Sequence, residues 1–318
     1  MANDADRMTA KVAYLYYIKK MRQQEIADSL QISRFKVLRL LKHAEESGIV
    51  EVKIKEPLGS CTELELQIKQ AFGIRDVIVV PAEIGPIEVV GKALGPAAGT
   101  YLSDLITDGM TVCVSWGRTL HHAVTNMSPA HHSNTSVVQF MGGLARISQG
   151  IDAQVVAHRL AELFGAKCHL LHAPAVTKSP TLKSQLLREP SIQRTLDLAS
   201  RSDIALFGLG VPDDASPLVY AGYISAEDVR SFASVGAVGT IGARLYDARG
   251  KEVGNGYLER VIGLSLEQLR AIPLKVAVAG GLHKAAAIAG ALSGGLVDVL
   301  ITDEETAAMV CAIRRETH

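Results

Sequence analysis

Seven short apolar runs alternate with longer amphipathic segments along the chain from residue 76 onward. The runs are almost purely apolar, and the segments between them repeat apolar residues at helical spacing. Strands that alternate with helices in this way form a parallel sheet covered by helices on both faces. We therefore predict an α/β domain with strands at 76–80, 111–115, 136–140, 168–171, 204–209, 276–279 and 297–302. Helices are predicted at 87–105, 120–126, 152–164, 190–200, 226–234, 285–293 and 304–315.

Glycine-rich or polar turns follow five of the predicted strands. In parallel sheets, ligands bind beyond the carboxyl ends of the strands, where the strand order reverses. Each turn alone is ordinary loop chemistry, but several on one edge of a sheet favour a binding site. The turns are Ser115-Trp116-Gly117-Arg118-Thr119, Met141-Gly142-Gly143 with Arg146 nearby, Gly208-Leu209-Gly210, Gly280-Gly281-Leu282-His283-Lys284 and Thr302-Asp303-Glu304-Glu305.

Two of these turns favour an anionic ligand. Gly117, beside hydroxyl residues at a helix start, can present backbone N–H groups to an anion, and Arg118 can clamp a phosphate or carboxylate. A purely structural glycine turn explains the same residues equally well. Lys284 falls in the first turn of a helix, where the helix dipole disfavours a cation. A bound anion offsets that cost. A phosphate ligand therefore explains the position of Lys284 better than the alternative that this lysine is only solvated.

Residues 22–53 predict two short helices joined by a tight turn and followed by a hairpin. Ser33 can cap the second helix, which repeats apolar residues at i, i+3, i+4 and i+7 from Val37. Its opposite side has four basic residues and no acidic one between residues 33 and 42, and such a helix fits the DNA major groove. Basic helix faces are usually only solvated surface, but the turn, the cap and the strand expected at 49–52 together favour a winged helix-turn-helix that binds double-stranded DNA. The residues expected at DNA are Gln23, Ser33, Arg34, Phe35, Lys36, Arg39 and Lys42.

Charge separates this segment from the rest of the chain. Residues 1–56 contain eleven Lys and Arg against eight Asp and Glu, whereas the 318-residue chain has zero formal net charge. Pro57 and Gly59 indicate a linker, and 62–72 predicts a connecting helix that ends at Gly73. We expect a DNA-binding domain at 1–56, completed by a helix at 6–19. A linker and connecting helix follow at 57–72, and a ligand-binding and oligomerisation domain at 73–318.

The remaining signals are typical of a cytoplasmic protein without metal or cofactor. The four cysteines are scattered singly, with no CxxC pair, as expected for reduced thiols. The first residues are polar and acidic, and the longest apolar stretch, 285–297, is too short and glycine-rich to span a bilayer, so no signal peptide or membrane contact is expected. Histidines are adjacent at 121–122 and at 131–132. Adjacent residues on a helix do not face the same site, so neither pair is expected to bind a metal ion. Residues 213–214 suggest a solvated loop, and 246–251 a hairpin turn.

Together these motifs resemble the SorC-type (SorC/DeoR-type) sugar-responsive bacterial transcriptional regulators. The resemblance covers essentially the whole chain, from Gln23-Gln24-Glu25-Ile26-Ala27 onward. It implies a Rossmann-like effector domain similar to phosphosugar isomerases, a phosphorylated sugar as effector, and assembly into homodimers or homotetramers. The motifs that carry it are Val114-Ser115-Trp116-Gly117, Gln139-Phe140-Met141-Gly142-Gly143, Arg260-Val261-Ile262-Gly263-Leu264, and Ala279-Gly280-Gly281 with Lys284, running on to Leu300-Ile301-Thr302-Asp303-Glu304.

The resemblance also implies roles for single residues. It assigns the turn at 115–119 and Lys284 to the phosphate, and Gln139, Gly142, Gly143 and residues 239–242 to the sugar. Thr240 departs from the family, which usually has an acidic residue there, and Arg118 replaces a small or hydroxyl residue. These departures suggest a more anionic or differently hydroxylated effector, so phosphorylated polyols and other small anions stay open. The effector-binding residues expected are Ser115, Trp116, Gly117, Arg118, Thr119, Gln139, Gly142, Gly143, Arg146, Thr240, Asp247, Gly281, His283 and Lys284.

The sequence thus predicts a transcription factor of a carbohydrate or polyol catabolic operon, with operator affinity controlled by a phosphorylated effector. The alternative is a phosphosugar isomerase-like enzyme that retains a DNA-binding domain, which needs a general base near the phosphate turn. The candidate bases Asp247, Asp303 and His283 resemble loop residues, so we do not expect an enzyme. A dinucleotide-binding redox sensor is excluded because no predicted strand is followed by GxGxxG.

Overall fold

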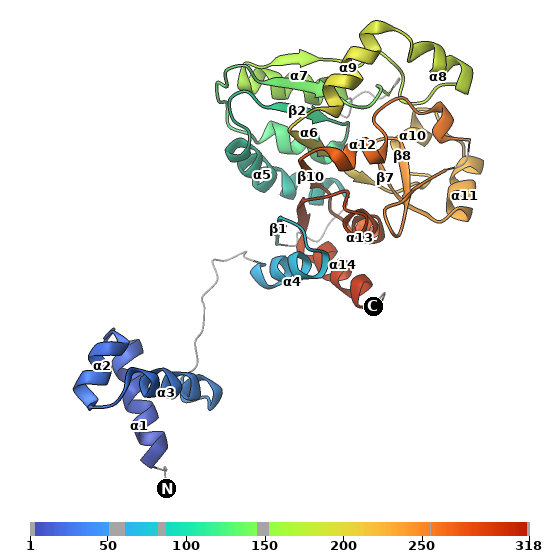
Figure 1. Ribbon diagram of the computed structural model, residues 1–318. Coiled ribbons are helices and arrows are strands. Elements are labelled where there is room, and N and C mark those ends of the chain that lie inside the picture. Colours follow the sequence, from blue (N-terminus) through green and yellow to red (C-terminus); the bar gives the residue numbers. More distant parts are fainter. Residues whose placement is uncertain (1–3, 51–60, 82–86, 145–152, 255, 317–318) are drawn as a thin grey trace. The chain divides into compact units, whose positions relative to one another are not determined.

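The computed structural model describes residues 4–50, 61–81, 87–144, 153–254 and 256–316 (Figure 1). The chain divides into two compact units, Met1–Leu58 and Gly59–His318. Because each unit has its own hydrophobic core, the two are described separately.

The N-terminal unit consists of helices around a small core. α1 (Asp4–Ala13) continues into a π-helical turn, η1 (Tyr14–Ile18), which confirms the helix predicted at 6–19. α2 (Gln23–Leu30) and α3 (Arg34–Glu46) follow and bury the apolar faces predicted for them. The buried residues of this core are Val12, Ile26, Ala27, Val37 and Leu41.

Three residues shape the turn between α2 and α3. Gln31 adopts a left-handed conformation, with φ of 53°, and ends α2. Ile32 packs against the core. Ser33 caps α3 as predicted, because its hydroxyl accepts a hydrogen bond from the backbone N–H of Lys36 at 3.2 Å. Residues 51 and 52 of the expected strand, and the expected linker at 56–60, lie outside the described residues.

A parallel sheet forms the centre of the C-terminal unit and confirms the seven predicted strands. The strand order is β1-β11-β10-β5-β2-β3-β4, and each neighbouring pair is parallel. β4 ends two residues before the predicted end, because the N–H of Leu171 donates to the side chain of Gln139 instead of to a strand. The strands are β1 (Asp76–Val80), β2 (Thr111–Val114), β3 (Ser136–Gln139), β4 (Lys167–His169), β5 (Ile204–Phe207), β10 (Leu274–Val278) and β11 (Val299–Asp303).

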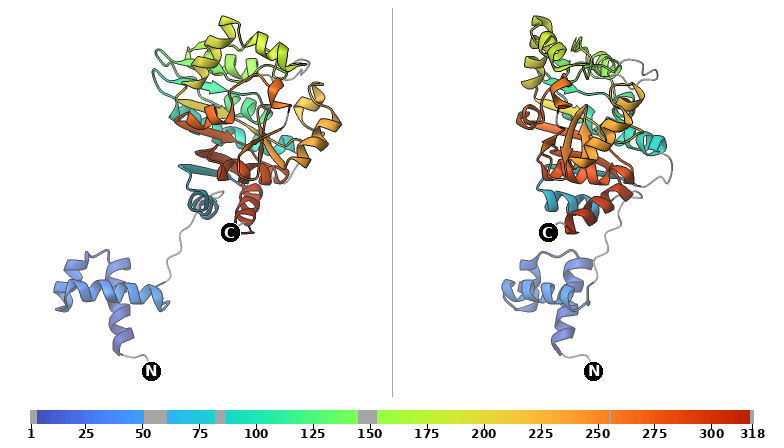
Figure 2. Two further views of the ribbon diagram at one scale, coloured as in Figure 1. Left: turned by 45° about the vertical axis from the view of Figure 1, so that its right-hand side comes forward. Right: turned by 90° about the vertical axis from the view of Figure 1, so that its right-hand side faces the viewer.

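Helices cover both faces of this sheet (Figure 2). Successive strand residues belong to different cores, as Val112 and Cys113 of β2 show. One core is completed by α5 (Ile87–Leu105), α6 (Arg118–Thr125) and α7 (Ala153–Phe164). The other is completed by α4 (Thr62–Phe72), α9 (Pro190–Ser200), α12 (Leu266–Ala271), α13 (Ala285–Ser293) and α14 (Glu304–Glu316).

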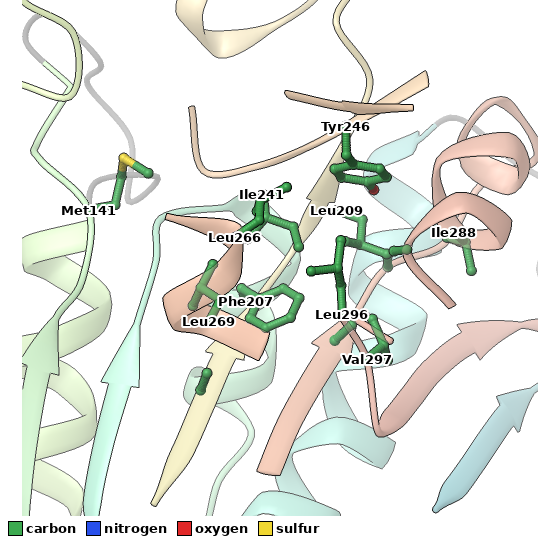
Figure 3. Packing of buried hydrophobic residues seen from close by; sticks show 14 of the residues in the cluster. Met141, Phe207, Leu209, Ile241, Tyr246, Leu266, Leu269, Ile288, Leu296 and Val297 are labelled. Atoms are coloured by element: carbon green, nitrogen blue, oxygen red, sulfur yellow. The ribbon is translucent and has the colours of Figure 1, made fainter. Parts of the chain in front are cut away.

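A small antiparallel sheet, which the sequence analysis does not predict, follows β5. Tyr246 of this sheet packs with Leu209 and Ile241 in the core that α13 and α14 help to complete (Figure 3). The Tyr246 hydroxyl donates to the carbonyl of Ala287 in α13 at 3.0 Å. The hairpin turn predicted at 246–251 is confirmed between β8 and β9. The strands of this sheet are β6 (Leu209–Gly210), β7 (Ala237–Ile241), β8 (Arg244–Asp247) and β9 (Glu252–Val253).

The helices predicted between the strands all occur, as α5, α6, α7, α9, α11 (Ala226–Ser234), α13 and α14. The sequence analysis misses α8 (Pro180–Leu186), α10 (Pro217–Tyr220) and α12. Each of these three is seven residues or shorter, too short to show a helical period. Their N-terminal caps are Ser179, Ser216 and Ser265.

Candidate functional site

A cavity lies at the carboxyl ends of β2, β5 and β10. β3 and β4 lie on one side of β2 in the sheet, whereas β5, β10 and β11 lie on the other. The strand order therefore reverses between β2 and β5, which is where parallel sheets bind ligands.

The cavity brings together residues from turns that are distant in sequence. The turn after β2, strand β7 and the turn after β10 each contribute to its wall. Half of the effector-binding residues expected from the sequence line it. These are Trp116, Gly117, Arg118, Thr119, Thr240, His283 and Lys284.

Lys284 lies where the turn after β10 becomes helical. The short 3-10 turn η3 (Leu282–Lys284) leads directly into α13, so Lys284 occupies the N-terminal end of that helix, as predicted. Burial, and then the neighbouring Arg118 cation, lower the pKa of Lys284 to about 8, although Asp303 and Asp213 oppose the shift. At pH 7 two cations therefore line one cavity, Arg118 at the start of α6 and Lys284 at the start of α13, an arrangement that a bound anion stabilises.

His283 lines the same cavity beside Lys284. Partial burial, and then the Lys284 charge, lower the pKa of His283, so its imidazole is mainly neutral at pH 7. A neutral imidazole offers a ligand one hydrogen-bond donor and one acceptor rather than a charge.

Asp303 stabilises the glycine turn that carries these two residues. One of its carboxylate oxygens accepts hydrogen bonds from the Gly281 N–H and the Thr306 hydroxyl, both at 2.7 Å. A Cβ on Gly280 would lie 2.4 Å from the same carboxylate, so the turn requires glycine there. Gly281, with φ of 101°, also adopts a conformation that favours glycine. Neither Asp303 nor Gly281 is a cavity-lining residue.

Ser115 and Gln139 are buried near the strand ends and do not line the cavity. The Ser115 hydroxyl donates to the carbonyl of Trp116 at 3.2 Å. The Gln139 amide donates to the carbonyl of Met141 at 2.6 Å and accepts from the N–H of Leu171 at 3.2 Å. Both side chains therefore form hydrogen bonds with backbone groups.

The turn after β3 also lies outside the cavity lining. A Cβ on Gly142 would lie 2.4 Å from the backbone of Pro174, so this glycine permits close packing of two chain segments. Gly143 forms an isolated β-bridge with Pro174. Arg146, expected near this turn, lies outside the described residues.

Asp247 lies at the β8–β9 hairpin and not in the cavity wall. Its carboxylate accepts hydrogen bonds from the backbone N–H groups of Arg249 and Lys251, both at 2.9 Å. These bonds close the hairpin turn.

The loop after β6 supplies lining residues that the sequence analysis does not single out. The solvated loop predicted at 213–214 holds for Asp214, but Asp213 is only partly exposed and lines the cavity. The Asp213 carboxylate accepts the backbone N–H of Ala215 at 3.0 Å. This loop follows a strand of two residues, which is too short to give a sequence signal. The other lining residues are Gly91, His122, Gly208, Leu209, Gly210, Val211, Ala215, Ser216, Pro217 and Gly242.

Helix α3 presents a second candidate surface, on the N-terminal unit. Its inner side buries Val37, Leu41 and Ala44, and its outer side is exposed and largely basic. Lys42 pairs with Glu46 at 3.6 Å, and Gln23 is half-buried at the start of α2. The exposed residues that the sequence analysis assigns to DNA are Ser33, Arg34, Phe35, Lys36, Arg39 and Lys42.

Within the described residues, no group of three or more His, Cys, Asp or Glu side chains could hold a metal ion. No helix in the same part of the chain has the length and apolar character needed to cross a membrane.

Comparison with known proteins covers nearly the whole chain. Residues 56–312 match the family model described as "Putative sugar-binding domain". The chain is 33% identical to the Escherichia coli K12 protein named Uncharacterized transcriptional regulator YjhU, over 94% of this chain and 92% of that protein. It is 30% identical to the Deoxyribonucleoside regulator of Bacillus subtilis, over 96% of this chain and 98% of that protein. The crystal structure of the full-length sorbitol operon regulator SorC from Klebsiella pneumoniae is similar, with a TM-score of 0.76 and 28% identity, covering 97% of this chain and all of that one.

Proposed function

The chain belongs to the family of SorC/DeoR-type transcriptional regulators with a sugar-binding domain, and on this premise we propose that it regulates a carbohydrate or polyol catabolic operon. A small phosphorylated sugar or polyol binds in the cavity at the ends of β2, β5 and β10 and controls the affinity for operator DNA. The observation that carries this proposal is that Arg118, at the start of α6, and Lys284, at the start of α13, line the same cavity.

The phosphate of the effector binds between the turn after β2 and the start of α13. Helix N-termini present free N–H groups and favour negative charge. Arg118 can donate two parallel hydrogen bonds to a phosphate, and Lys284 adds a compact point charge. Because a phosphate ester offsets the repulsion between these two cations, the site favours it over a neutral sugar.

The remainder of the effector is hydroxylated. Ser216 and Thr240 bring hydroxyl groups to the cavity wall, and Asp213 brings a carboxylate that can accept hydrogen bonds from ligand hydroxyls. Asp213 therefore supplies an acidic group although Thr240 is uncharged. We assign a supporting role behind the cavity wall to Ser115, Gln139, Gly142, Gly143, Asp247 and Gly281.

The N-terminal domain, residues 1–56, binds the operator as a winged helix-turn-helix. α2 and α3 are its two helices, and α3 enters the major groove. Phosphate contacts position the domain and base contacts select the sequence. We assign base contacts to Arg34, Lys36 and Arg39 and phosphate-backbone contacts to Ser33 and Lys42. Gln23 and Phe35 are assigned to the same DNA-binding surface.

Regulation requires more than one copy of the chain. A single DNA-binding domain makes too few contacts for tight specific binding, so residues 73–318 assemble into a homodimer or homotetramer that presents two such domains to symmetric half-sites. Residues 57–72 connect the two parts. The effector changes how the subunits pack, and thereby the spacing of the DNA-binding domains.

An isomerase-like enzyme is the alternative that this site disfavours. The carboxylates of Asp247 and Asp303 bond to backbone groups and lie outside the cavity lining. His283 alone of the three candidate bases lines the cavity. We expect no conversion of sugar phosphates on prolonged incubation, as followed by NMR; turnover that His283→Ala abolishes would reverse this assignment.

Operator selection followed by effector titration tests the proposal. Duplexes enriched from random DNA by the full chain are bound in fluorescence anisotropy with and without sugar phosphates, polyol phosphates and their unphosphorylated parents. At least one phosphate ester should change operator affinity several-fold or more, and Arg118→Ala should remove the response, whereas the exposed Arg188→Ala should retain it. Failure to enrich any sequence would contradict the DNA-binding function. A response only to the unphosphorylated parents would contradict the phosphate site.

A further inference from the structure

Phe35 is the most exposed large hydrophobic residue of the described chain, with a relative accessibility of 89%. It is the second residue of α3. At about 100° per residue, Phe35, Arg39 and Lys42 project from the side of the helix opposite the buried stripe that begins at Val37. The ring therefore lies in the centre of the outer face and not at its edge.

The N-terminal unit does not use this ring for its own stability. Phe35 is absent both from the buried core of that unit and from the half-buried residues packed against it. Within the described residues, no aromatic or cation–π partner is found for it. Leu38, one turn further along α3, is also exposed, at 50%, so the two side chains form an exposed apolar pair on this helix. Burial of such apolar surface against a partner is favourable.

Charge around the ring decides what kind of occupant fits. Four basic residues and no acidic one lie between Ser33 and Lys42, and the basic side chains surround Phe35 on the helix surface. This surface complements a polyanion better than a second apolar protein face. An apolar group inside a polyanion is available in the major groove of DNA, where thymine exposes its C5 methyl group.

We propose that Phe35 packs against the C5 methyl group of a thymine in each operator half-site and thereby distinguishes thymine from the other bases. This inference rests on the proposed DNA-binding function. N-terminal residues of a recognition helix contact base edges, and phenylalanine is one of the side chains that contact the thymine methyl. The neighbouring cations attract phosphate whatever the sequence. Phe35 carries no charge, so its contribution falls on sequence selectivity and not on salt-dependent affinity.

Deoxyuridine substitution tests this contact, because it removes only the methyl group. The operator duplex enriched from random DNA is resynthesised with deoxyuridine at one thymine at a time, and the full chain is titrated in anisotropy. One thymine in each half-site should weaken binding about fourfold when replaced, the loss expected for one buried methyl group. Phe35→Ala should bind the thymine and deoxyuridine duplexes equally. Its affinity for random DNA, and the slope of log K against log salt, should match the parent protein.

Ile18→Ala is the matched control, since Ile18 is an exposed apolar residue of the same unit, 64% accessible, that lies outside α3. It should retain the full sensitivity to deoxyuridine, and thermal melts should show both variants folded. Operator binding without any sensitive thymine, or the same sensitivity in Phe35→Ala, would overturn the methyl contact and leave the DNA-binding function standing. If no sequence is enriched at all, the DNA-binding function itself fails.

Discussion

Lys284 lowers the stability of the unliganded protein at neutral pH. Its pKa of about 8 lies below the ordinary value of 10.5 because burial and Arg118 disfavour the charged form in the fold. Between these two pH values the unfolded chain binds more protons than the folded one. The contribution of this group to stability therefore rises with pH across that window, and the full penalty is present below pH 8.

Replacing Lys284 by methionine is expected to stabilise the unliganded protein. Lys284→Met should raise the free energy of unfolding at pH 7 by about 2 kcal/mol, because it removes a partly buried charge and keeps an apolar stem of similar length. Urea denaturation measures the change. The same substitution at the exposed Lys178 should leave the free energy of unfolding unchanged. A loss of stability in Lys284→Met would show that the cation is satisfied within the fold and needs no anion.

Gly280 tests how tightly the turn after β10 is packed. An alanine Cβ there would meet the Asp303 carboxylate at 2.4 Å and Leu94 at 2.9 Å, so Gly280→Ala should lower the free energy of unfolding by about 2 kcal/mol. Gly208 follows β5 in a comparable turn, but its nearest contact would be 3.7 Å away, so Gly208→Ala should change stability by less than about 1 kcal/mol. Equal effects in urea denaturation would contradict the packing argument.

The N-terminal cap of α3 can be tested by replacing Ser33. Ser33→Ala removes the side-chain acceptor of the Lys36 N–H, which also donates to the Ser33 carbonyl at 2.9 Å, and should cost about 1 kcal/mol of local helix stability. Hydrogen exchange should show the Lys36 amide exchanging about fivefold faster at the same global stability. Ser47→Ala, at the other end of the helix, removes a hydroxyl that donates to the His43 carbonyl and should leave the Lys36 amide unchanged. No change in Ser33→Ala would contradict the capping role.

The elements predicted correctly from the sequence are those long enough to show a periodic pattern and those with a clear boundary residue. β5, β10 and β11 are buried on both faces, so their apolar runs are unambiguous, and α9 begins at Pro190 as its sequence indicates. In the antiparallel sheet, β6 and β9 escaped prediction because they have two residues each, and alternation over two residues carries no information.

The same reason explains which cavity residues the sequence could indicate. Arg118 and Lys284 lie in the turns after β2 and β10 at the carboxyl edge of one parallel sheet, so the topology rule places them together. Asp213 comes from the loop after β6, and its position depends on how that short strand turns into the second sheet. Gln139 follows the same rule as Arg118, but its side chain bonds to the backbone of the neighbouring loop. The sequence pattern does not indicate the direction in which a single side chain points.

In the whole molecule, we expect effector binding and operator binding to be reciprocally coupled. A coupling of about 1–3 kcal/mol changes operator affinity by several-fold to roughly a hundredfold, and the operator must change effector affinity by the same factor. Anisotropy titrations of operator with and without effector, and calorimetric titrations of effector with and without operator, measure both arms. Effector binding that leaves operator affinity unchanged would contradict regulation through this cavity.

A thermal-shift screen tests whether the cavity binds a phosphorylated effector through Lys284. The full chain is melted with sugar phosphates, polyol phosphates and their unphosphorylated parents. A ligand at about 100 times its dissociation constant adds about 2.7 kcal/mol to the folded state, which is a clear rise in Tm. We expect a phosphate ester to raise the Tm of the parent protein and of Lys178→Met but not the Tm of Lys284→Met. A rise caused only by unphosphorylated compounds, or an undiminished rise in Lys284→Met, would contradict it.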